Sequence, residues 1–137
     1  MKQFVWPVRV YYEDTDAGGV VYYASYLRFM ERARSEWLRS IGLHQEALSR
    51  RHGVLFVVRS VSLDYRRAAR LDDLLEVRSR IAGARGARLV FDQAVVLPDA
   101  AGPPLCQGQV TVACVQADSF RPRPLPRLLL TEMLGDG

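Results

Sequence analysis

The segment from Asp14 to Tyr26 constrains this chain most, because it joins an apolar stretch to a strongly amphipathic one through a tight turn. Carboxylates end the apolar stretch, two glycines follow, and small apolar residues lead into a helical pattern. A helix start offers backbone N–H groups without intrahelical acceptors and the positive end of the helix dipole. An acid or base beside such donors is what acyl transfer requires. The segment therefore indicates acyl-transfer chemistry at this turn.

A helical period follows the turn, from residue 23 or 24 to residue 41. Apolar side chains recur at steps of four, three, four and four residues, which is the spacing of one helix face. The residues on this face are Tyr26, Met30, Ala33, Trp37 and Ile41. Gly42 is a suitable stop for this helix. A second short helix is predicted over residues 44–51, ending at Gly53.

The later part of the chain alternates apolar and polar residues with a period of two, as strands do. After a first strand over residues 4–12, this pattern predicts strands near residues 60–65, 75–81, 89–97 and 110–114. The apolar stripe of the long helix must be buried on the sheet. We therefore expect an α+β fold with about five antiparallel strands. The chain is expected to be a single domain, residues 1–137. Residues 118–137 are expected to be an extended or frayed C-terminal segment, with a short helix over 128–137 as the alternative.

Composition excludes several classes of protein. No apolar run approaches the ~18 residues of a membrane span, and the N-terminus lacks a signal peptide's apolar core, so we expect a cytoplasmic protein without a membrane span. The net charge is +4, but there is no basic run or aromatic-rich recognition motif, so no nucleic-acid partner is expected. Cys106 and Cys114 lie in one predicted strand, roughly 26 Å apart and beyond disulfide reach. No zinc-ligand spacing is present.

Two ordered stretches carry a resemblance to a known family. They are Asp-x-Asp-Ala-Gly-Gly-Val-Val-Tyr-Tyr-Ala-Ser-Tyr at residues 14–26 and Phe-Met-Glu-Arg-Ala-Arg-Ser-Glu at residues 29–36. The chain resembles the 4-hydroxybenzoyl-CoA thioesterase family over about residues 4–117, and within it the Tol–Pal-associated acyl-CoA thioesterases. The resemblance implies a hotdog fold, a long helix wrapped by a curved antiparallel sheet. It also implies a homodimer or homotetramer with its sites at the dimer interface.

The activity that the resemblance implies is hydrolysis of an acyl-CoA thioester to a carboxylic acid and CoA, without a metal or redox cofactor. Acyl carrier protein is a second possible carrier of the acyl group. One alternative is a hydroxybenzoyl-type thioesterase acting on aromatic acyl-CoA. Another is a non-catalytic subunit that binds acyl-CoA or acyl carrier protein. Thioester turnover by the pure protein separates an enzyme from a binding subunit.

In the resemblance, Asp16 matches the family's catalytic carboxylate, which is either a nucleophile or a general base for water. The alternative is a turn aspartate that bonds the backbone of the glycine-rich turn. Tyr23 matches the position whose backbone N–H polarises the thioester carbonyl. Many Tol–Pal-type members have histidine there, so a proton-transfer role for that side chain does not carry over to this chain.

The remaining candidate residues would bind the substrate. Gly18 and Gly19 would let the backbone approach it closely or adopt positive φ, although a simple tight turn explains them equally well. Tyr22 and Tyr26 would line an acyl pocket, with core packing as the alternative. Nearly all positive charge is arginine, whose fork suits phosphates. The candidates for binding the CoA phosphates, with solvated surface arginines as the alternative, are Arg66, Arg67, Arg85 and Arg88.

Three further carboxylate residues have other possible roles. Glu13 and Asp14 resemble part of a hard-cation site, but the sequence offers no further ligands, so no metal is expected. Glu31 is a possible second catalytic carboxylate on the helix, with a surface ion pair as the alternative.

Overall fold

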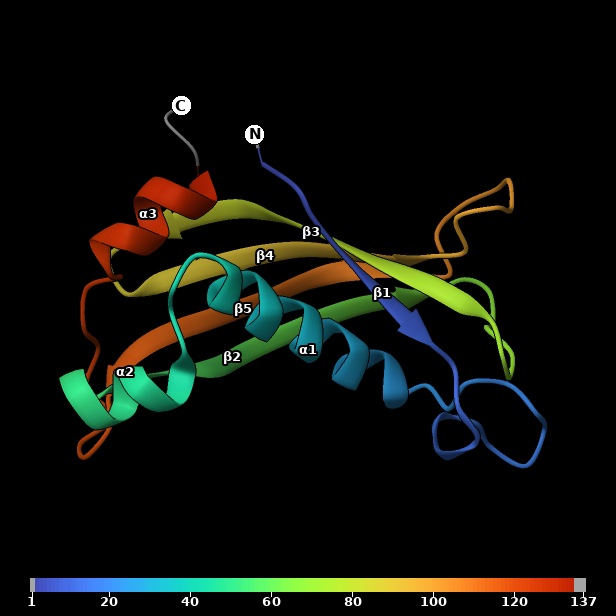
Figure 1. The fold of residues 1–137 in the computed structure, drawn as a ribbon, viewed down its shortest axis with the longest axis horizontal. Coiled ribbons are helices and arrows are strands. Elements are labelled where there is room, and N and C mark those ends of the chain that lie inside the picture. Colours follow the sequence, from blue (N-terminus) through green and yellow to red (C-terminus); the bar gives the residue numbers. More distant parts are fainter. Residues whose placement is uncertain (1, 135–137) are drawn as a thin grey trace.

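The computed structural model describes residues 2–134. These residues form one sheet of five strands, with helices between the first two strands and after the last (Figure 1). In chain order the elements are β1 (Phe4–Arg9), the 3-10 turn η1 (Tyr12–Asp14), α1 (Ser25–Ser40), α2 (Gln45–His52), β2 (Val54–Tyr65), β3 (Leu74–Arg85), β4 (Arg88–Val96), β5 (Cys106–Gln116) and α3 (Arg127–Leu134).

The sheet has the strand order β1-β3-β4-β5-β2, and every neighbouring pair is antiparallel. Helix α1 runs across one face of this sheet (Figure 1). Strands β1 and β2 form the two opposite edges of the sheet. In the sequence they are joined by the long segment that contains α1 and α2. The prediction of an α+β fold with one long helix and about five antiparallel strands is therefore confirmed.

The apolar stripe of α1 is buried on the sheet in two clusters. Towards the start of the helix, Phe29 and Met30 pack with Leu75 and Val77 of β3. Towards its end, Trp37 joins a second cluster with the inward side chains of β4 and β5. Each large apolar side chain that is fully buried contributes about 1.5–3 kcal/mol. This burial fixes where the helix begins, and with it the position of the turn that precedes it.

The helix ends agree with the glycine signals in the sequence. Gly42 follows α1 with φ of 92°, and Gly53 caps α2 in the left-handed conformation with φ of 66°. The first strand is shorter than the predicted 4–12, because the chain turns at η1 once the N–H of Tyr11 is bonded by the carboxylate of Asp14. Strand β2 begins at Val54, earlier than the alternation at residues 60–65 indicated, because its first half is apolar on both faces.

The C-terminal segment packs against the core. The chain turns at residues 117–119 and then continues without a helix or strand to residue 126, and Pro122 bridges to Val115 of β5, so the expected extended segment is interrupted at its start. Of the two alternatives for residues 128–137, the short helix is the one observed, because α3 buries Leu129 and Met133 in the second cluster. Residues 135–137 lie outside the described part of the chain. Cys106 and Cys114 are both free and buried.

Candidate functional site

Asp16 lies exposed in the tight turn that joins the two halves of the motif. Its Oδ1 accepts a hydrogen bond from the N–H of Gly18 at 2.8 Å. Its backbone N–H donates to the carbonyl of Val20 at 2.9 Å, and its carbonyl accepts from Gly19 at 3.1 Å. Gly19 has φ of 80°, a conformation that favours glycine. The carboxylate thus has one oxygen held by the turn, while its other oxygen has no partner among the described residues.

Asp14 anchors this turn to the start of α1. Its side chain is buried and its Oδ2 accepts from the N–H of Tyr11 at 2.9 Å. Its carbonyl accepts from the N–H of Tyr22 at 2.8 Å and from the hydroxyl of Ser25 at 3.2 Å. The residue considered as a metal ligand is therefore a structural support of the loop. Residues 2–134 contain no cluster of three or more His, Cys, Asp or Glu side chains that suits a metal ion.

Tyr23 stands just before α1, as the sequence predicted. The N–H of Ser25 bonds the carbonyl of Tyr22 at 2.8 Å, and the N–H of Leu27 bonds the carbonyl of Ala24 at 3.2 Å. The N–H of Tyr23 itself has no acceptor within the described part of the chain. It is a free donor at a helix start, where the dipole is positive.

Four tyrosines gather beside this donor. The ring centroid of Tyr23 lies 4.8 Å from that of Tyr22 and 6.1 Å from that of Tyr65, and the rings of Tyr65 and Tyr26 are 5.6 Å apart. Tyr26 is also a core residue, because its ring is buried and its hydroxyl accepts from the N–H of Ala69 at 3.0 Å. Burial raises the pKa of Tyr26, so its hydroxyl stays protonated. Tyr65 was not among the predicted site residues, although its position at the end of a predicted strand could have indicated that it belongs to the site.

A pocket of about 270 Å³ opens at this tyrosine cluster. It is lined by Val21, Tyr23, Tyr26, Tyr65, Arg66, Arg67 and Ala68. Arg66 is exposed at its rim and has no ion pair among the described residues. Arg67 is engaged elsewhere, because its guanidinium donates to the carbonyls of Ala101 and Pro103 in the loop before β5. This geometry makes Arg67 a brace of that loop and leaves it poorly placed for a phosphate.

Arg85 and Arg88 lie at the opposite end of the sheet, in the hairpin between β3 and β4 (Figure 1). With Arg59 of β2 and the exposed ring of Phe120 they line an open pocket of about 530 Å³. From Arg88 to Val95, which pairs with β5 beside Tyr65, the strand rises roughly 23 Å. The structure therefore separates these two arginines from Asp16 within one chain. Arg59 was not predicted as part of this cluster, because nothing in the sequence pairs it with the hairpin.

Comparison with known proteins gives the family context of this arrangement. Residues 10–133 match the model of the thioesterase-like superfamily. The chain is 50% identical over 129 residues to the acyl-CoA thioester hydrolase YbgC of Escherichia coli O6:H1, with 94% of each chain covered. It is 44% identical over 124 residues to the acyl-CoA thioesterase YbgC of Haemophilus influenzae, covering 90% of this chain and 89% of that one.

Solved structures give a similar result. A probable thioesterase from Bartonella henselae superposes with a TM-score of 0.83 at 35% identity, covering 91% of this chain and all of that one (100%). A 1,4-dihydroxy-2-naphthoyl-CoA thioesterase from Synechocystis superposes with a TM-score of 0.89 at 26% identity, covering 97% and 96% of the two chains. None of the helices in residues 2–134 is long and apolar enough to cross a membrane.

Proposed function

This chain belongs to the thioesterase-like superfamily and has its hotdog fold, and we propose that it hydrolyses acyl-CoA thioesters through the carboxylate of Asp16. The activity rests on similarity over nearly the whole chain to acyl-CoA thioester hydrolases of two bacteria. The observation that carries the role of Asp16 is its geometry. One carboxylate oxygen is fixed by the N–H of Gly18, and the other has no partner within the described part of the chain.

The free oxygen of Asp16 has two ways to cleave the thioester. As a general base, it takes a proton from water, and that water attacks the carbonyl carbon. As a nucleophile, it attacks the carbonyl carbon itself, and water then hydrolyses the resulting anhydride. Either route releases the thiolate of CoA, a good leaving group because a thiol has a pKa of ~8.5. One carboxylate is therefore sufficient to start the reaction.

The free N–H of Tyr23 is the candidate donor to the developing oxyanion. A preset backbone donor at a helix start stabilises negative charge on the carbonyl oxygen in the transition state. The anchoring of the loop by Asp14 supports this role, because it holds the neighbouring Tyr22 and Ser25 in place. The aromatic side chain of Tyr23 then borders the acyl group rather than transferring a proton.

A homodimer that pairs two β2 edges would complete the site. Strand β2 is a long edge strand with exposed apolar residues, since Val58 is 51% and Val61 is 43% exposed. Such an edge pairs readily with another strand. A two-fold axis would pair the strands antiparallel, so the Val54 end of one β2 would lie beside the Tyr65 end of the other.

This pairing would resolve the separation between Asp16 and the hairpin arginines. Arg59, Arg85 and Arg88 belong to the Val54 end of the sheet, and would lie near the tyrosine end of the partner. There they would bind the phosphates of a CoA whose thioester reaches the partner's Asp16. We also propose that the protein is a homodimer or a homotetramer, and that the acyl group is carried by CoA or by acyl carrier protein. The two free cysteines are typical of a reducing compartment, so we also propose a cytoplasmic location.

The substitution Asp16→Asn tests the proposed function. Asparagine keeps the turn but can neither attack as a carboxylate nor accept the proton, so kcat for an acyl-CoA should fall roughly 10²–10⁴-fold. The thermal midpoint of the same sample should stay within about 3 °C of the wild type, since a surface turn is involved. A variant that keeps more than about half of the wild-type kcat would remove Asp16 from the mechanism. Glu31 would then be the carboxylate to test.

An aromatic acyl group is the second candidate substrate class. Two observations favour it: the tyrosine in place of histidine at residue 23, and the pocket walled by Tyr23, Tyr26 and Tyr65. A screen of kcat/KM across short, long and aromatic acyl-CoA separates the two classes.

A further inference from the structure

A second cavity, of about 80 Å³, lies between α1 and the half of the sheet nearest the Val54 end of β2. Its walls are mostly apolar, with Leu38 of α1, Phe56 of β2 and Phe91 of β4 among them. Its polar lining consists of Glu31, Arg34, Ser35 and Gln45. At about 30 Å³ for each water-sized group, the cavity holds only a small part of a ligand.

Arg34 is the unusual member of this lining. Only 9% of the residue is exposed, and its Nη1 donates to Oε1 of Gln93 at 2.9 Å. Gln93 is itself locked, because its Nε2 donates to the carbonyl of Met30 at 3.0 Å and to the hydroxyl of Ser79 at 2.9 Å. The guanidinium also lies over the ring of Phe91, 5.9 Å from its centroid. Arg34 is thus held rigidly in the wall of the cavity.

The positive charge of Arg34 has no ion-pair partner among residues 2–134. A guanidinium has five N–H donors, and one hydrogen bond to the protein leaves most of them open. Its Nε and Nη2 have no acceptor among the described residues, and Arg34 is one of the residues that line the cavity. Burial lowers the pKa of Arg34, which reflects the cost of desolvating its charge, and the attraction of the Glu31 carboxylate offsets part of this lowering. A buried charge without a counter-charge in direct contact is unfavourable unless something else compensates it.

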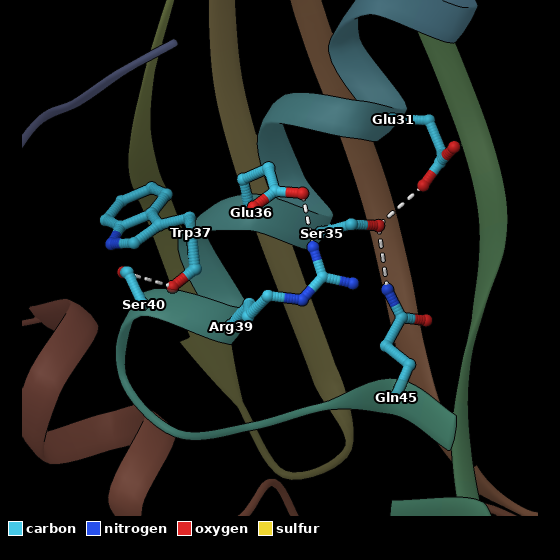
Figure 2. A network of polar contacts seen from close by, with 7 residues as sticks. All are labelled: Glu31, Ser35, Glu36, Trp37, Arg39, Ser40 and Gln45. Atoms are coloured by element: carbon cyan, nitrogen blue, oxygen red, sulfur yellow. Dashed lines mark hydrogen bonds and ion pairs between the residues drawn. The ribbon is translucent and has the colours of Figure 1, made fainter. Parts of the chain in front are cut away.

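Glu31, three residues before Arg34 on the same helix, hydrogen-bonds another side chain. Figure 2 shows the Glu31 carboxylate directed at Ser35, whose hydroxyl donates to its Oε2 at 2.5 Å. Gln45, at the start of α2, donates to the same hydroxyl at 2.9 Å. These three residues form the polar rim of the cavity. Glu31 therefore sits at the mouth, held by Ser35, and forms no ion pair with the guanidinium behind it.

We propose that this cavity binds a carboxylate group at the far end of the acyl chain, with Arg34 as its counter-ion. The substrate class would then include thioesters of dicarboxylic acids. This inference rests on the proposed function and on the proposed dimer. In that dimer, the half of β2 that carries Phe56 lies beside the partner's tyrosine end. The cavity lies between α1 and the sheet, and the acyl chain of a thioester at the partner's Asp16 would have to reach it across the paired β2 edges.

Two acyl-CoA probes of equal size test the proposal. Glutaryl-CoA ends in a carboxylate, and 5-methylhexanoyl-CoA has the same number of non-hydrogen atoms with an isopropyl group in its place. The wild type should hydrolyse glutaryl-CoA with the higher kcat/KM. The substitution Arg34→Met should lower the ratio of the two kcat/KM values roughly 100-fold. The exposed Arg32 of the same helix provides the matched control, because Arg32→Met should leave the ratio unchanged.

A third variant tests the sign of the charge effect without touching the buried network. Glu31→Gln removes a like charge from the mouth of the cavity, so it should raise the ratio of kcat/KM for glutaryl-CoA to kcat/KM for 5-methylhexanoyl-CoA. If Arg34→Met does not fold, the Glu31→Gln variant and the ratio of the two kcat/KM values in the wild type still test the proposal. A wild type that prefers 5-methylhexanoyl-CoA, or a ratio that neither variant changes, overturns the proposal while leaving the thioesterase activity intact.

A wild type that hydrolyses no acyl-CoA at all would instead contradict the proposed function. Calorimetric titration with free glutarate then tests the cavity by itself. Binding that is lost in Arg34→Met and kept in Arg32→Met would support a carboxylate site, and absence of binding in the wild type would overturn it.

Discussion

Oδ1 of Asp16 lies 2.8 Å from the backbone nitrogen of Gly18, and a Cβ added to Gly18 would lie only 3.2 Å from that same oxygen. A glycine is therefore needed at residue 18 because a side chain there would contact the carboxylate of Asp16. The backbone conformation of the turn does not itself require a glycine at this residue. Gly19 differs, since it has φ of 80° and open space where a Cβ would be. The two adjacent glycines thus have separate physical reasons, and substituting each should have a separate effect.

We predict that Gly18→Ala lowers activity without lowering stability. The added methyl group displaces the Asp16 carboxylate by a few tenths of an ångström, and misplacement of a reacting group should reduce kcat roughly tenfold. Gly19→Ala should instead destabilise the fold by about 1–2 kcal/mol, because its backbone is left-handed. Measuring kcat and the free energy of unfolding for both variants checks this. Equal effects of the two substitutions on both quantities would contradict the assignment.

Local patterns were sufficient to predict the elements of this fold. The spacing from Tyr26 to Ile41 predicted α1, and the glycine stops predicted for α1 and α2 were confirmed at Gly42 and Gly53. The apolar half of β2 was missed because residues 54–58 are a continuous apolar run, which shows no alternation. The packed C-terminal helix was left open between fraying and folding, because its apolar residues need a core that only the sheet supplies.

The candidate site was predictable only where its residues are neighbours in sequence. Asp16, Gly18 and Tyr23 belong to one loop, so the turn and the helix start could be predicted together. Tyr65 and Arg59 join their clusters through strand pairing, and no local pattern encodes that register. The arginines were grouped by residue type alone. The structure separates Arg67, which braces a loop, from the hairpin arginines at the far end of the sheet.

We predict that the hairpin arginines bind the phosphates of CoA. Arg85→Ala and Arg88→Ala should each raise KM for an acyl-CoA roughly tenfold with little change in kcat, since hydrogen bonds to charged groups are strong. KM of the wild type should also rise with salt, because screening weakens such contacts. The control substrate is the N-acetylcysteamine thioester of the same acyl group, which has no phosphates and should show neither effect. A KM that changes neither with salt nor with these substitutions would exclude the hairpin arginines as the residues that bind the CoA phosphates.

The buried Cys106 predicts a specific loss of stability at alkaline pH. Burial raises the pKa of its thiol from 9.0 to about 11. Between these values the unfolded chain has released this proton while the folded chain still holds it, so the free energy of unfolding falls as the pH rises. Cys106→Ala should therefore lose less stability than the wild type between pH 9 and pH 11. Urea unfolding of both proteins across this range measures the difference, and parallel curves would show that the thiol ionises freely in the folded state.

The last prediction concerns which chain supplies the arginines. One parent carries Asp16→Asn, and the other carries alanine at Arg59, Arg85 and Arg88. Assayed alone at low substrate concentration, both should be nearly inactive. If the arginines act on the partner's Asp16, a heterodimer of the two has one fully intact site, since its native carboxylate faces native arginines. Mixing equal amounts under subunit exchange produces about half heterodimers with one active site in two, so about a quarter of the wild-type rate should return.

The same mixture distinguishes the opposite arrangement. If each Asp16 used the arginines of its own chain, no site in the heterodimer would be intact and mixing would restore nothing. The roughly 23 Å that β4 rises between Arg88 and Val95 argues against this arrangement within one chain. A mixture of Asp16→Asn with the wild type is the control for dilution, because its rate should fall in proportion to the wild-type chains removed. Recovery with the arginine variant, and only dilution with the control, would establish a site built from two chains.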